Sequence, residues 1–355
     1  FFGVVALFFA LAILGLNLQW GVTGLFNVGV AGFVLLGAYG SVILTSPVQA
    51  DRIGGLDLPV PVGWLGGSLL AGLFAFLVGI PALRLRHDYL AITTFGIAVT
   101  LQLVALNATA LTGGPFGQGF IPRPLYTEIG DNTLWNIGYL ALVGGLVVAV
   151  HGALERLVRS PWGRVVRAIR EDEAAAEALG KDAFRYRLQA FVLGSMIMGL
   201  AGAVYAHFVG FIAPEDFLPI LTFQVWAMLI VGGSGSNRGA ILGAVVVWAL
   251  WALSSALLDQ LVAPETKVRA AALQVAVIGA GRRRPPGPAA GSCRRAPRRV
   301  AARDRPGPPW ASRVNREARH RRRRPRGLTR HRPGSLLSPS GSREAQRCVV
   351  APSRF

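Results

Sequence analysis

The sequence predicts an all-α integral membrane protein: a polytopic bundle of about 7–9 transmembrane helices with a disordered basic tail. Residues 1–280 consist mainly of long runs of Leu, Val, Ala, Gly and Phe, and one bilayer crossing takes about 20 such residues. The 355-residue chain has a formal net charge of +19, but residues 281–355 hold 22 Arg against three acidic residues. The first 280 residues are therefore formally neutral, and the charge excess belongs to the tail.

Apolar segments recur along the first part of the chain. Residues 1–16 form the first, which opens without Met or a charged n-region and is expected to be a truncated helix rather than a signal peptide. Residues 17–44 are apolar and rich in glycine, a pattern that predicts close helix contacts or a broken helix lining a cavity. Further crossings are expected at 64–83, 89–106, 134–154, 188–209, 219–231 and 240–262, and residues 270–280 begin one more that stops early.

The loop at residues 155–187 predicts the orientation of the bundle. It contains eight of the chain's Lys and Arg residues, and short loops rich in these residues stay on the cytoplasmic side. Counting crossings backwards places the Gly- and Pro-rich loop around residues 112–124 outside, where only Arg123 is basic.

A short helix is expected within this loop, in "SPWGRVVRAIREDEAAAEALG" at residues 160–180. Ser160 and Pro161 are typical of a helix start, because Ser can cap free amides and Pro fits the first turn. Glu171, Asp172 and Glu173 open a second helical segment with acids at its N-terminus, and Gly180 can end it in a left-handed conformation. The flat alanine face suits either docking into a groove of another protein or plain connection between spans.

Uncharged polar residues in the spans are the candidates for a translocation path. They either line that path or hydrogen-bond between helices, and the Thr112–Gly114 stretch forms either an outer gate or a turn. These candidates are Asn27, Thr93, Thr94, Gln102, Thr112, Gly113 and Gly114. His151 and Glu155, four apart, are expected to be a snorkelling pair, and His207 is expected at the membrane interface. No catalytic residue, metal site or cofactor is expected.

Five blocks of the chain resemble the LivM-type permeases of branched-chain amino acid ABC transporters, in that family's order. The blocks are "LRLRHDYLAITTFG", "LTGGPFGQGFIP", "RAIREDEAAAEALGKDAFRYRLQAF", "GLAGAVYAHFVGFIAPEDF" and "LIVGGSGSNRGAILGA". The third block is similar to the coupling loop of ABC importer permeases, whose pattern is Glu-Ala-Ala, three residues, Gly. Ala175, Ala176 and Gly180 keep that spacing, while Ala174 stands where the family has Glu and Glu173 lies one place early.

The resemblance implies a permease subunit of an ATP-driven importer for branched-chain or related amino acids, in the bacterial cytoplasmic (inner) membrane. It implies as partners two ABC ATPase subunits, a second, LivH-like permease subunit, a soluble substrate-binding protein and membrane lipid, with no nucleic acid. A cytoplasmic coupling helix would contact the ATPase through Glu171, Asp172, Glu173, Ala174, Ala175, Ala176, Glu177, Ala178, Leu179 and Gly180.

The sequence therefore predicts a permease domain at residues 1–280, with its coupling loop at 155–187, and an Arg/Pro-rich tail at 281–355. The abrupt onset of the tail inside an unfinished span, together with its lack of Lys, suggests a frameshift product. The competing hypothesis is a membrane-anchored polybasic protein that binds nucleic acid or anionic lipid through this tail.

Overall fold

The computed structural model describes residues 1–261 apart from 49–53, 86, 125 and 127–129. The predictions for residues 270–280 and 281–355 lie outside these described residues. The main helices are α1 (Phe2–Leu16), α2 (Val30–Thr45), α3 (Val60–Ala82), α4 (His87–Asn107), α7 (Asn132–Arg159), α10 (Ala183–Val209), α11 (Pro219–Gly232) and α12 (Asn237–Leu261). Shorter pieces join them: η1 (Asn17–Val22), α5 (Thr109–Thr112), η2 (Gly114–Phe116), α8 (Pro161–Glu171), α9 (Glu173–Ala178) and η3 (Pro214–Phe217).

The predicted polytopic helical membrane fold is confirmed. Six helical segments within the described residues are long and apolar enough to cross a membrane, including α1 with its continuation η1. The helices α2 and α11 are apolar but shorter. At about 1.5 Å per residue, the 14 residues of α11 cover roughly 21 Å, less than the ~30 Å hydrocarbon core of a bilayer. The expected crossing at residues 219–231 is thus a short helix that follows the turn η3.

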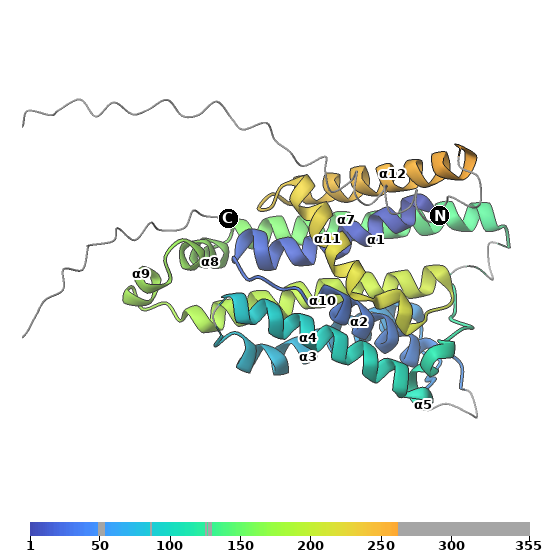
Figure 1. The fold of residues 1–355 in the computed structure, drawn as a ribbon, viewed down its shortest axis with the longest axis horizontal. Coiled ribbons are helices and arrows are strands. Elements are labelled where there is room, and N and C mark those ends of the chain that lie inside the picture. The colour runs from blue at the N-terminus through green and yellow to red at the C-terminus, as the bar shows by residue number, and fades with distance from the viewer. Residues whose placement is uncertain (49–53, 86, 125, 127–129, 262–355) are drawn as a thin grey trace, which may run out of the picture. The chain divides into compact units, whose positions relative to one another are not determined.

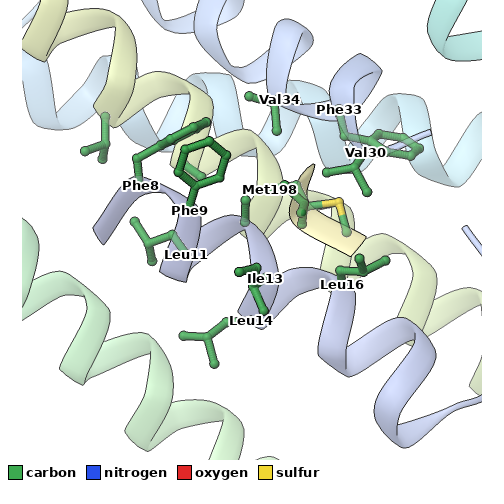
Figure 2. Packing of buried hydrophobic residues seen from close by; sticks show 14 of the residues in the cluster. Phe8, Phe9, Leu11, Ile13, Leu14, Leu16, Val30, Phe33, Val34 and Met198 are labelled. Carbon is green, nitrogen blue, oxygen red and sulfur yellow. The ribbon is translucent and has the colours of Figure 1, made fainter. Parts of the chain in front are cut away.

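The core lies around α1, α2 and α10. Twelve of the 15 residues of α1 are buried, and α10 packs against α1, α2 and α3. Figure 2 shows side chains from α1, α2 and Met198 of α10 meeting in this core. A helix that is apolar all round and enclosed on all sides needs no polar face, which explains the composition of α1.

The peripheral helices instead leave apolar side chains exposed. Along α3 they follow the helical spacing of one face, at Leu65, Leu69, Leu73 and Leu77. In a membrane such a face contacts lipid, so the exposed leucines complete the description of a transmembrane bundle.

The glycine-rich stretch at residues 17–44 contains both a helix break and a close contact between helices, the two features expected from its composition. Its first part continues α1 as the π-helical turn η1, residues 24–29 are non-helical, and α2 begins at Val30. Further along, α2, α3 and α10 converge at Gly37, Gly67 and Gly199. A Cβ on Gly37 would overlap the backbone of Gly199, and one on Gly67 would overlap the carbonyl of Gly37. Only glycine lets these three backbones approach so closely.

Candidate functional site

The segment α8–α9 leaves the bundle at the end where α7 finishes and α10 begins (Figure 1). Pro161 starts α8, as predicted, but Ser160 does not cap it: its hydroxyl donates backwards to the carbonyl of Leu157, 2.6 Å away. Glu171 closes α8 instead of opening the second helix. Asp172 provides the cap of α9, its Oδ1 accepting from the amide of Ala175 at 3.0 Å.

The end of α9 follows the predicted pattern. Gly180 has φ +76°, in the left-handed region that glycine adopts without strain. Two residues later Asp182 caps α10, accepting from the amide of Arg185 at 3.1 Å. The chain therefore makes a compact turn between two capped helices.

A small apolar cluster and two charged contacts fasten α8 and α9 to the bundle. Ile169, Ala176 and Ala183 are buried against one another, so α8, α9 and the start of α10 share a core of their own. Arg187 of α10 pairs with Glu173 of α9 at 2.6 Å. Arg170 of α8 donates from Nη1 to the carbonyl oxygen of Gly21 in η1.

The outward surface of this segment contains apolar as well as charged residues. Among the ten predicted contact residues, Ala176 is buried and Glu173 is half-buried, so neither forms the open face. Leu179 is 81% exposed, although it is a large apolar side chain. The face consists of Glu171, Asp172, Ala174, Ala175, Glu177, Ala178, Leu179 and Gly180. Leu179 is its one large apolar side chain, and the alanines and the glycine beside it are small.

A polar junction ties η1 to α7 and α12. Asn17 donates to the side-chain oxygen of Asn237 at 2.8 Å and accepts from the amide of Gly235 at 2.9 Å. Asn237 in turn donates to Glu155 at 3.2 Å. A cavity of about 420 Å³ opens beside the junction, lined by Val22, Glu155, Val158, Arg159, Arg167, Gly235, Ser236, Asn237 and Arg238.

The second polar group surrounds the helix break at residues 24–29. Asn27, fully buried, donates to Gln19 at 2.8 Å and accepts from the amide of Gly29 at 2.7 Å. Thr94 of α4 accepts from the amide of Val28 at 3.0 Å. Two of the predicted path residues thus meet at this break: Asn27 lies within it and Thr94 faces it from α4, and each accepts a hydrogen bond from one of its amides.

Sequence reasoning missed the residues that complete this group. Gln19 donates to the hydroxyl of Ser195 at 3.1 Å, and Trp226 donates to the carbonyl of Asn27 at 2.9 Å. Thr222 accepts from the amide of Ala31 at 3.0 Å. The only signal in the sequence is that each is a polar or indole side chain inside an apolar helix.

The other predicted path residues lie elsewhere. Thr93 is half-buried, and the side chain of Gln102 is buried in α4 and makes no hydrogen bond to any described residue. Thr112 accepts from the amide of Gly114 at 3.2 Å, and Gly113 has φ +77°, so these three residues form a turn after α4. Their role in transport stays a prediction.

The histidines differ from each other. Glu155 bonds to Arg159 at 2.7 Å and to Asn237, while His151 makes no hydrogen bond within the described part of the chain. The prediction that His207 is interfacial is wrong: it is fully buried, 3.0 Å from the hydroxyl of Thr45. The described residues contain no group of three or more His, Cys, Asp or Glu side chains able to hold a metal.

Comparison with known proteins gives the family. The family described as "Branched-chain amino acid transport system / permease component" matches residues 1–280. The chain belongs to this family. The resemblance inferred from the five sequence blocks is thereby confirmed.

Members of this permease family with curated descriptions are similar along most of the described chain. The high-affinity branched-chain amino acid transport system permease protein LivM of Escherichia coli is 35% identical over 255 residues, 66% of this chain and 58% of that protein. LivM of Salmonella typhimurium has the same identity and coverage. LivH of Escherichia coli is 24% identical over 266 residues, 71% of this chain and 83% of that protein.

The chain spans 58% of the length of the two LivM proteins. No solved structure gives a significant match. The family match at residues 1–280 includes the whole bundle from α1 to α12 and the α8–α9 segment.

Proposed function

We propose that this chain is a permease subunit of an ATP-driven importer for branched-chain or related amino acids, located in the bacterial cytoplasmic membrane. The observation that carries the proposal is the match of the permease family to residues 1–280. Its relatives LivM and LivH are both named as permease proteins of high-affinity branched-chain amino acid transport. The transmembrane bundle would form part of the translocation path, with the polar residues around Asn27 and Thr94 at its helix break.

The proposed partners follow from this assignment. Two ABC ATPase subunits would hydrolyse ATP, a LivH-like subunit would be the sister permease, and a soluble binding protein would deliver the substrate. Loop 155–187 would then lie in the cytoplasm, in agreement with its basic residues.

The exposed face of residues 171–180 is the proposed ATPase contact. Contacts between this segment and the bundle support the proposal, in addition to the composition of the face. Arg187 and Glu173 connect α9 directly to α10, one of the central helices, and Arg170 connects α8 to the end of α1 through η1. A displacement of α9 by the ATPase would therefore move both α10 and η1, which border the helix break.

The test uses the assembled importer in proteoliposomes with the ATPase subunits, the sister permease and the binding protein. Leu179→Asp should abolish ATPase co-purification and ATP-dependent uptake of radiolabelled leucine, because it places a charge on the apolar point of the docking face. Leu56→Asp is the matched control, since Leu56 is 62% exposed in the loop before α3. If the Leu179→Asp importer still co-purifies with the ATPase and takes up leucine, this face is not the contact. Failure of the unmodified importer to take up leucine, isoleucine or valine would reject the substrate assignment.

A further inference from the structure

A second cavity, of about 250 Å³, opens among five elements of the bundle: α1, α10, η3, α11 and α12. Pockets that enclose drug-sized ligands measure about 300–1,000 Å³, so this one suits a small metabolite. Tyr205 lines it four residues before the end of α10, whereas α10 begins at Ala183 beside α9. At about 1.5 Å per residue these two positions are roughly 33 Å apart along the helix. The pocket therefore lies at the end of the bundle opposite the α8–α9 segment.

Its inner wall is aromatic and held in place by ring contacts. Phe8 packs against Tyr205 with ring centroids 4.8 Å apart, and Phe9 packs against Trp248 at 5.2 Å. Figure 2 shows Phe8 and Phe9 as neighbours on α1. Each pair joins α1 to a different helix, so the wall is preformed. Such a surface accommodates an aliphatic chain and also favours a nearby cation.

Three polar groups face the same pocket with bonding capacity to spare. Asp216 accepts one bond, from the amide of Ala213 at 2.9 Å, and pairs with no basic side chain in the described part of the chain. The Tyr205 hydroxyl and the Gln224 amide line the pocket and make no hydrogen bond to any residue that the structure describes. Asp216 is exposed in the turn η3, whereas Tyr205 and Gln224 are half-buried, so the cavity combines one open carboxylate with two enclosed polar groups that a polar ligand can pair with.

The chemistry of these groups selects a zwitterion. The carboxylate of Asp216 attracts an ammonium group, while the Gln224 amide and the Tyr205 hydroxyl can donate to a carboxylate. A simple amine would leave the two donors unused, and a simple acid would be repelled by Asp216. An α-amino acid satisfies all three groups, and an aliphatic side chain fits against Phe8 and Phe9.

We propose that this pocket is a binding site for a free aliphatic α-amino acid, with Asp216 on the ammonium and Gln224 and Tyr205 on the carboxylate. The inference rests on the proposed function and adds to it a substrate contact site. Because the pocket lies opposite the proposed ATPase contact, it would face the side from which substrate enters. The same head-group chemistry occurs in the ammonium and phosphate of phosphatidylethanolamine, so the test must separate free amino acid from lipid.

Binding of tritiated leucine to the full chain in phosphatidylcholine nanodiscs is the direct measurement. Asp216→Asn should weaken binding at least about tenfold, because it removes the negative charge that attracts the ligand's ammonium group. It keeps a side-chain oxygen that can accept from the amide of Ala213. Glu215→Gln is the matched control, since Glu215 is the adjacent exposed acid and does not line the pocket, and it should stay within about twofold. Gln224→Met should also weaken binding severalfold. Unlike Asp216, Gln224 caps no helix, so its replacement changes only the pocket lining. Unchanged binding in both pocket variants would overturn the proposal.

Competition and lipid composition identify the ligand. Isopentylamine and 4-methylpentanoate should each compete at least about tenfold less well than leucine, since each lacks one of the two charged groups. Equal competition by the amine would overturn the zwitterion assignment. Leucine binding that disappears when phosphatidylethanolamine replaces half of the phosphatidylcholine would show a lipid head-group site instead.

Uptake by the assembled importer distinguishes a failure of the pocket proposal from a failure of the proposed function. If the unmodified importer takes up leucine and both pocket variants match it, the pocket proposal fails while the proposed function stands. If the unmodified importer takes up no branched-chain amino acid, the proposed function itself fails. Uptake that falls in both pocket variants but not in Glu215→Gln supports both.

Discussion

Arg187 and Glu173 join α10 to the first residue of α9, with Nη1 of the arginine 2.6 Å from Oε1 of the glutamate. The arginine side chain is only 14% exposed, whereas the glutamate is 42% exposed. One partner is thus anchored in the bundle and the other belongs to the exposed segment. This ion pair orients the proposed docking face relative to a central helix.

The first prediction concerns that pair. Arg187→Met keeps an unbranched side chain but removes the charge. It should lower the free energy of local unfolding of α9 by only about 1 kcal/mol, because Glu173 is partly exposed and solvent weakens the ion pair. Amide hydrogen exchange at residues 173–180 should accelerate about fivefold. Arg185→Met is the control, since its pair with Asp182 is 80% and 49% exposed and should contribute little. Equal acceleration in both variants would contradict the anchoring role of Arg187.

The second prediction concerns the close approach of α2 to α10. Gly37→Ala should destabilise the protein by at least about 1–3 kcal/mol, because its Cβ would overlap the backbone of Gly199. Gly96→Ala is the control: a Cβ at Gly96 meets nothing within 4 Å, and alanine favours helix by about 0.5–1 kcal/mol. Denaturant unfolding in detergent compares the two. If the two variants unfold alike, the helices do not depend on this contact.

A third prediction addresses the polar junction at the end of α1. Asn17→Ala should lower the free energy of unfolding by about 1–3 kcal/mol, because it leaves Asn237 and the Gly235 amide without their partner. Asn136→Ala removes only an exposed bond to Asn132 within α7 and should be almost neutral. The same unfolding measurement applies, and a neutral Asn17→Ala would show that the junction is replaceable.

The fourth prediction tests the buried histidine. Both ring nitrogens of His207 have polar neighbours: Nε2 lies 3.0 Å from the hydroxyl of Thr45, and Nδ1 lies 2.8 Å from the carbonyl of Ala203 and 3.3 Å from the indole nitrogen of Trp64. His207→Leu should cost about 1–3 kcal/mol by leaving these groups unpaired. His151→Leu is the matched control, because His151 has no hydrogen bond to the described residues. Thermal unfolding should separate them, and equal midpoints would refute a structural role for His207.

Much of the candidate site was predictable from local sequence, and the structure shows why. The helix of residues 173–178 depends on neighbours a few positions away: Asp172 caps it and Gly180 ends it. Such short-range signals are written in consecutive residues. The buried position of Ala176 was not predictable, because it depends on Ile169 and Ala183 closing over it.

The interior polar group shows the opposite limit. Asn27 and Thr94 stood out as polar residues in apolar segments, but their partners are distant in the chain. Gln19 lies 176 residues from Ser195, and Asn27 lies 199 residues from Trp226. His207 was misplaced for the same reason, since Thr45 and Trp64 enclose it only after α2, α3 and α10 have packed.

The sequence by itself determined the membrane class, the order of the apolar helices, the short capped helix between α7 and α10, and the family. These properties depend on hydropathy over about 20 residues or on motifs of a few residues, so local composition specifies them. Only the tertiary structure decided which polar groups meet, which glycines allow backbone contact, and that Tyr205, Asp216 and Gln224 line one pocket. Those relationships depend on packing between distant segments, whose geometry no local pattern encodes.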